Sequence, residues 1–97
     1  MFALPFIYNL KLNAMTNDLI EKYLAPRNQE EKEMKIFFKQ RSTITGLFVK
    51  GNDYDELRSK NFWRIVSSGN VPTWKKTKDI NLAKIFNGSE FTRLAED

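Results

Sequence analysis

The chain has 97 residues, 16 of them lysine or arginine and 12 aspartate or glutamate, so its formal net charge is +4, and it contains neither cysteine nor histidine. Without cysteine it can form no disulfide, no thiolate nucleophile and no zinc site with sulfur ligands. Without histidine it lacks the commonest general base and the commonest metal ligand. The composition therefore favours binding over catalysis.

Length and composition predict one small globular domain, residues 1–97. With 41% hydrophobic and 29% charged residues, the chain is able to bury a single modest core. No apolar run approaches the roughly 18 residues that a membrane helix needs, and no basic residue precedes the apolar start, as it would in a signal peptide. We therefore expect a cytoplasmic protein without a membrane partner, in keeping with the lack of cysteine.

The positive charge is concentrated in one segment. Residues 1–56 have no net charge, whereas residues 57–84 carry seven basic side chains and one acidic side chain, a net +6. Residues 85–97 carry a net −2. The basic segment also holds both tryptophans, and cations together with aromatic rings are typical of surfaces that bind nucleic acid.

Residues 2–12 predict a strand, which Pro5 would place at the edge of a sheet. An alternative is that Met15 is the natural start and that the preceding residues are an upstream extension. In the first case, apolar side chains of this strand would pack on the sheet of this chain or on a neighbouring chain. These side chains are Phe2, Leu4, Phe6 and Tyr8.

The segment Thr16-Asn17-Asp18 predicts a helix N-cap, and the apolar residues after it have helical spacing. A short amphipathic helix should therefore follow and end at Pro26. Residues 27–33 are polar and predict a loop. The apolar residues of the predicted helix are Leu19, Ile20, Tyr23 and Leu24.

The middle of the chain alternates between β-prone runs and turn signals. Residues 34–40 fit either a strand or a helix, and the β-prone run Ile36-Phe37-Phe38 favours the strand. Residues 43–49 predict a second strand. One helical turn over residues 53–60, capped by Asp53, should then lead into the next strand.

Residues 62–67 predict a further strand, closed by the turn Ser68-Gly69-Asn70. In this strand, Arg64 and Val66 share one face, while Trp63 lies on the other. Residues 74–78 come after Pro72 and predict an extended segment.

The tail allows two interpretations. Asn87-Gly88 between two β-prone runs is a typical signal for a type I′ hairpin. Alternatively, Asp79 caps a helix over residues 80–86, Gly88 ends it, and a second short helix follows over residues 90–96. The helical interpretation is slightly favoured because the hairpin gives no clean apolar face.

Together these elements predict an α+β domain with a small antiparallel sheet of three to five strands and one or two short helices. An SH3-like, barrel-like arrangement is one form that such a sheet could take. The predicted core consists of apolar residues on the inner faces of these elements: Leu19, Ile20, Tyr23, Leu24, Ile36, Phe38, Leu47, Val49, Trp63, Ile65, Leu82, Ile85 and Phe86.

The leading candidate site is a basic-aromatic surface within residues 58–78. Its cations would bind phosphate groups, and Trp74 would offer a ring to a base, whereas Trp63 is expected in the core. The competing interpretation is that the lysines only solvate an exposed face. The predicted binding residues are Arg58, Lys60, Arg64, Trp74, Lys75, Lys76 and Lys78.

The acidic run over residues 52–56 is a weaker candidate, for a cation site. It lacks the ligand spacing of an EF-hand, and acidic residues in the first turn of a helix explain it better. The glycines match no nucleotide-binding motif. We therefore predict no metal and no cofactor.

The sequence thus predicts a non-enzymatic binding module whose partner is nucleic acid or an acidic protein surface. A rival interpretation is an assembly module that forms a homo-oligomer through its apolar N-terminal residues. A third interpretation is a small ribonuclease that works without histidine.

The third interpretation comes from residues 61–66, Asn-Phe-Trp-Arg-Ile-Val, which resemble the central strand of RelE-type toxins. In those toxins an arginine sits on a strand rich in aromatic and aliphatic residues. The resemblance implies that Arg64 would hold a scissile phosphate, with Lys60 and Lys76 nearby. It covers only this strand, because the chain has neither the opening helical hairpin nor the basic-aromatic tail of the toxins. No catalytic residue is therefore assigned.

Overall fold

The computed structural model describes residues 15–25 and 32–97, so the predicted strand at residues 2–12 and most of the predicted loop at 27–33 lie outside the described residues. In chain order the described elements are α2 (Asn17–Leu24), β1 (Met34–Phe38), β2 (Ile44–Val49), α3 (Tyr54–Ser59), β3 (Phe62–Ser67), η2 (Ser68–Asn70), α4 (Val71–Thr77), η3 (Ile80–Leu82), β4 (Ala83–Asn87), η4 (Gly88–Glu90) and β5 (Phe91–Glu96), where η denotes a 3₁₀ helix. None of the helices in these ranges is long and apolar enough to cross a membrane.

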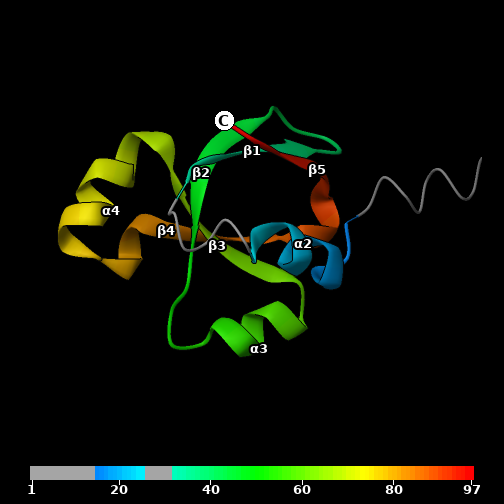
Figure 1. The fold of residues 1–97 in the computed structure, drawn as a ribbon, viewed down its shortest axis with the longest axis horizontal. Helices are drawn as coiled ribbons and strands as arrows, with labels where there is room; N and C mark the ends of the chain where they lie inside the picture. Colours follow the sequence, from blue (N-terminus) through cyan, green and yellow to red (C-terminus); the bar gives the residue numbers. More distant parts are fainter. Residues whose placement is uncertain (1–14, 26–31) are drawn as a thin grey trace, which may run out of the picture.

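The five strands form one sheet in the order β4-β3-β2-β1-β5, and every neighbouring pair is antiparallel (Figure 1). The first four strands follow each other as a meander, and the last strand returns to pair with the first. β4 and β5 are therefore opposite edges of the sheet, although only η4 separates them in the chain. The predicted α+β fold with an antiparallel sheet is confirmed, and the sheet is open instead of closed into a barrel.

A separate hydrophobic core lies on each face of the sheet, and a helix covers each one. In β3, Trp63 and Ile65 belong to the core under α2, whereas Val66 belongs to the core under α4. This alternation follows from the two-residue period of a strand. The buried members of the first core are Ile20, Leu24, Met34, Ile36, Trp63, Ile65, Phe91 and Leu94, and those of the second are Leu47, Val49, Val66, Val71, Trp74 and Ala83.

Strand β2 changes partner at Gly46. Its first half pairs with β1 and its second half pairs with β3, and Gly46 is aligned with a residue of each. A Cβ atom at this position would lie 2.6 Å from the carbonyl oxygen of Val66 and 2.8 Å from the Cγ2 atom of Ile65. Glycine is therefore needed here because β3 approaches the backbone of β2 more closely than a side chain allows.

The predicted helix of residues 16–25 and the predicted strands β1, β2 and β3 are confirmed. The Oγ1 atom of Thr16 accepts a hydrogen bond of 3.2 Å from the backbone N–H of Leu19, as an N-cap should. Helix α3 is also confirmed, but its predicted cap is not. Asp53 occupies the N-cap position without a capping hydrogen bond, because its carboxylate binds Arg64 instead.

The predicted extended segment at residues 74–78 is wrong, because this stretch lies mainly in helix α4. Pro72 stands in the first turn of that helix, where no backbone N–H is needed and the fixed φ of proline suits the helix. With three α-helices, the described chain also has more helix than the one or two short helices that we expected.

Both interpretations of the tail are wrong, because residues 83–87 and 91–96 form strands that pair with β3 and β1 and not with each other. A type I′ turn needs positive φ at both central residues, whereas Asn87 has φ −86° and the φ of Gly88 is not positive. The Oδ1 atom of Asn87 instead accepts a bond of 3.0 Å from the N–H of Ser89 and starts η4. Asp79 does act as a cap, but of the short η3.

Two residues of the predicted core are on the surface: Leu19 is 51% exposed and Ile85 is 50% exposed. Leu19 lies on α2, of which only Ile20 and Leu24 are buried, and Ile85 lies on edge strand β4, of which only Ala83 is buried. Tyr23, Phe38, Leu82 and Phe86 are half-buried and pack against the cores, and the other predicted core residues are buried. The prediction omitted Met34, Val66, Val71, Trp74, Ala83, Phe91 and Leu94.

Candidate functional site

The seven predicted binding residues are distributed over three elements. Arg58 and Lys60 lie at the end of α3, Arg64 lies in β3, and the rest lie in or directly after α4. The remaining four are Trp74, Lys75, Lys76 and Lys78. Three of the cations are held by carboxylates, Trp74 is buried, and three lysines are exposed at the end of α4.

Arg64 is held by Asp53 through two hydrogen bonds, Nη2 to Oδ2 at 2.8 Å and Nε to Oδ1 at 3.3 Å. The hydrogen bond from the Arg64 guanidinium keeps the pKa of the Asp53 carboxyl below its ordinary value. Planar two-point pairing of this kind is specific in geometry as well as favourable in energy. Arg64 therefore anchors the loop between β2 and α3 to the sheet.

Arg58 belongs to a polar cluster between α2 and α3. Its Nε atom lies 2.9 Å from Oε1 of Glu21, and the hydroxyl of Tyr54 donates a hydrogen bond of 3.0 Å to Oε2 of the same carboxylate. Burial and then the hydrogen bond to Glu21 raise the pKa of Tyr54 well above its usual range, so the phenol remains a hydrogen-bond donor. The cluster joins the two helices.

Lys60 pairs with Glu56 one turn earlier on α3, with 3.6 Å between Nζ and Oε2. Both side chains are exposed, so this pair contributes little to stability. The ribonuclease interpretation needed Arg64, Lys60 and Lys76 around one phosphate. In the structure Arg64 is paired with Asp53 and Lys60 with Glu56, whereas Lys76 lies on α4.

Trp74 faces the sheet from α4 and is only 8% exposed, so most of its ring belongs to the core. Lys78, which follows α4 with φ 55°, places its Nζ atom 5.4 Å from the centroid of this ring. Lys75 and Lys76 are exposed on the last turn of the helix. The cations that face solvent on this side of the molecule therefore gather at the C-terminal end of α4.

A groove of about 370 Å³ runs between this end of α4 and the loop after β2. We name it the lysine groove; its lining residues are Lys50, Gly51, Asn52, Trp74, Lys78 and Ile80. Lys50 is exposed, and its Nζ atom lies 4.7 Å from the centroid of the Tyr54 ring. The same loop also lines a second, more open hollow beside Glu21 and Arg58.

Four lining residues were not among the predicted binding residues, and two of them, Lys50 and Asn52, have polar side chains. They precede the basic segment in the sequence, so the charge pattern did not include them. Their position in the sequence was the available signal. Both residues come just after a predicted strand, and a turn at that point places side chains at the end of the sheet. In the described ranges, no group of three or more acidic side chains is placed to hold a metal ion.

Comparisons of the chain with protein-family models, with curated proteins and with solved structures found no match. The fold and the groove therefore define the class: a small α+β domain with an open five-stranded antiparallel sheet and a cationic groove beside one of its helices.

Proposed function

We propose that this protein is a non-enzymatic binding module that holds nucleic acid by its phosphates in the lysine groove. One observation carries the proposal: Lys50 and Lys78 come from two different segments and line the same groove, and no acidic residue is among its lining residues. Lysine ammonium groups bind phosphates as point charges, without a fixed mutual orientation.

The acidic residue at the end of the groove loop supports this assignment, because Asp53 is bound to Arg64. Lys75 and Lys76, which follow each other on the last turn of α4, widen the positive surface beside the groove. They also complement the negative end of the helix dipole, so they serve the helix as well.

The low exposure of Trp74 determines the expected mode of binding. A ring that is only 8% exposed offers little surface to a stacked base. The groove should therefore contact the backbone of the nucleic acid and show little preference for sequence, while affinity should fall steeply as salt is added.

The test is fluorescence anisotropy of a labelled single-stranded 20-mer of mixed sequence over a series of salt concentrations. The double variant Lys50→Gln/Lys78→Gln should reduce the slope of log K against log salt by about 1.4, because each phosphate contact contributes about 0.7 on a single strand. The matched control is Lys22→Gln/Lys35→Gln, which removes the same charge from residues outside the groove. The control variant should bind the oligonucleotide only slightly more weakly than the parent protein does.

Absence of binding at low salt would reject the proposal. A control variant that reduces the slope as much as the groove variant would show that binding depends on the overall charge and not on the groove. Poly-L-glutamate provides the third comparison. If it competes as well as the oligonucleotide at equal charge concentration, the partner is an acidic protein surface and the assignment to nucleic acid is wrong.

A further inference from the structure

A third hollow lies between edge strand β4 and the turn that follows β1. It has a volume of about 340 Å³, and we call it the seam cleft. Its lining residues are Phe38, Gln40, Arg41, Ile85, Phe86, Asn87 and Glu90. Its size is at the lower end of the range for small-molecule sites, so it suits a single ring system.

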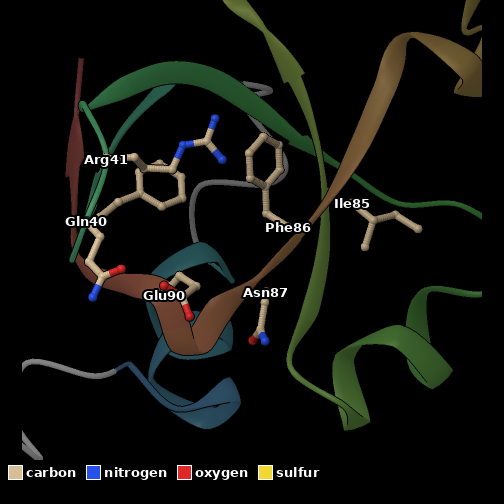
Figure 2. Close-up of a pocket in the computed structure, with 7 residues that line it drawn as sticks. Gln40, Arg41, Ile85, Phe86, Asn87 and Glu90 are labelled. Atoms are coloured by element: carbon tan, nitrogen blue, oxygen red, sulfur yellow. The ribbon is translucent and has the colours of Figure 1, made fainter.

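Aromatic rings form the inner wall of the seam cleft. The ring centroids of Phe38 and Phe86 lie 5.9 Å apart, with 47° between the ring planes. The Cζ atom of Arg41 lies 5.0 Å from the Phe38 centroid and 5.5 Å from the Phe86 centroid. In Figure 2, the Arg41 guanidinium extends toward Phe86, while Ile85 points to the other side of β4.

These three groups are planar, and each favours contact with another planar group. Phenyl rings prefer offset or edge-to-face partners, and a guanidinium stacks on rings and is only weakly hydrated. Arg41 is exposed, so the face of its guanidinium that is turned away from the rings can be reached from solvent. The wall therefore matches a flat, conjugated ligand better than a saturated one.

Polar groups of both kinds surround this wall. The Oδ1 atom of Asn87 already accepts hydrogen bonds from the N–H and Oγ atoms of Ser89, at 3.0 and 2.8 Å, which leaves its Nδ2 group as the donor. Gln40 offers a donor and an acceptor, and Glu90 offers a carboxylate acceptor. Alternating donors and acceptors along a flat edge are the pattern that a nucleobase presents.

The charges of the lining separate this cleft from the lysine groove. Arg41 and Glu90 are its two charged residues, and their charges cancel. Because the two charges cancel, the cleft offers a phosphate no net electrostatic attraction, so an uncharged heterocycle suits it better. We propose that the seam cleft binds one nucleobase, stacked on the outer face of the Arg41 guanidinium, whose other face lies over the two phenyl rings. This inference is independent of the proposed function, because a nucleoside carries no phosphate.

The experiment titrates the four ribonucleosides into the ¹⁵N-labelled protein and follows the backbone amides by NMR. At least one nucleoside should shift the amides of Gln40, Arg41 and Asn87, with a dissociation constant of roughly 0.1–1 mM, as expected for a ligand of this size. Ribose should cause no shift. N-acetyl-phenylalaninamide, which has a ring without nitrogen atoms, should bind at least about fivefold more weakly, because the wrong ligand leaves polar groups unpaired.

The variant Arg41→Gln should weaken nucleoside binding about two- to fivefold, the size of an exposed cation–π contact. Arg93 offers a matched control: its Cζ atom lies 4.2 Å from the ring centroid of Phe37, which is outside the cleft, so Arg93→Gln should leave the affinity unchanged. Phe86→Leu should weaken binding further. If that variant fails to fold, Arg41→Gln still tests the inference, because the side chain of Arg41 is on the surface.

Three outcomes would overturn the inference: no nucleoside shifts the cleft amides, N-acetyl-phenylalaninamide binds as tightly, or Arg93→Gln weakens binding as much as Arg41→Gln. Lys50→Gln/Lys78→Gln should not affect nucleoside binding, so failure of the lysine groove and failure of the cleft can be told apart. A short oligonucleotide identifies the source of the base. If the oligonucleotide shifts the cleft amides at a lower concentration than the nucleoside does, the ligand is a base within a strand. If the nucleoside acts at the lower concentration, the ligand is a free nucleoside.

Discussion

Asn61 connects three parts of the fold that are distant in sequence. Its Oδ1 atom accepts a hydrogen bond of 2.8 Å from Nε1 of the buried Trp63, and its Nδ2 group donates one of 3.2 Å to the carbonyl of Met15. Its own carbonyl accepts a bond of 2.7 Å from the N–H of Gly88. Asn61 also has φ 63°, in the left-handed region that asparagine tolerates better than most residues.

We predict that Asn61→Ala lowers the free energy of unfolding by about 2–4 kcal/mol, because a buried indole N–H loses its partner and alanine is strained at positive φ. Urea unfolding measures this loss. Asn61→Gly is the control, since it removes the same hydrogen bonds without the strain and should be more stable than the alanine variant by about 1 kcal/mol. Equal stability of the two variants would show that the backbone conformation contributes nothing.

At the scale of elements, the pair of Asp53 and Arg64 is the link between the loop before α3 and strand β3. Because the folded protein lowers the pKa of Asp53, the ionised carboxylate is stabilised by folding. Its contribution to stability is complete above the ordinary pKa of about 3.9 and is lost as the pH falls through the lower pKa of the folded state.

We therefore predict that Asp53→Asn is less stable than the parent protein at neutral pH, and that the difference shrinks as the pH falls below about 4. Thermal unfolding between pH 7 and pH 2.5 measures this. In the background of Arg64→Gln, the same substitution should have a smaller effect at every pH, because the partner of the carboxylate is gone. A difference that stays constant down to pH 2.5 would contradict the assignment.

Elements with local signals could be predicted from the sequence, and elements that depend on distant partners could not. The cap at Thr16 and the alternation in β3 are read from neighbouring residues, and both are confirmed. Helix α4 was not predicted, because residues 74–78 after Pro72 indicated an extended segment, although proline in the first turn suits a helix. The tail was missed because its strands pair with β3 and β1, which no local pattern indicates.

The candidate site was predictable to a similar degree. Local charge identified the lysines at the end of α4. It could not show that Arg58 and Arg64 are held by Glu21 and Asp53, because such pairs depend on how the elements pack. Lys50 lines the lysine groove only because α4 and the loop after β2 lie side by side. Its place in the site therefore follows from the fold and not from the local sequence.

At the scale of the whole molecule, the arrangement of the sheet depends on Gly46, where β2 passes from one partner to the other. We predict that Gly46→Ala lowers the free energy of unfolding by about 2–3 kcal/mol, because a methyl group would press on the rigid backbone of Val66. Thermal unfolding followed by circular dichroism measures the effect.

Gly69 is the matched control for this substitution. A Cβ atom there would have no neighbour within 4 Å, and its φ is not positive, so Gly69→Ala should change stability by less than about 1 kcal/mol. A Gly46→Ala variant as stable as Gly69→Ala would show that β3 can move away from β2 at little cost.

The pairing of the first strand with the last also determines the order in which the domain can assemble during translation. Met34 of β1 is aligned with Glu96 of β5, and the N–H of Met15, just before α2, bonds to the carbonyl of Phe91 at 3.2 Å. β2 and β3 can pair as soon as they have been synthesised, because the pairing is local. β1 keeps one open edge, and Met15 lacks its hydrogen-bond partner, until β5 has been synthesised. The contacts of Met15 and of the outer edge of β1 are therefore among the last to form, although both lie early in the described part of the chain.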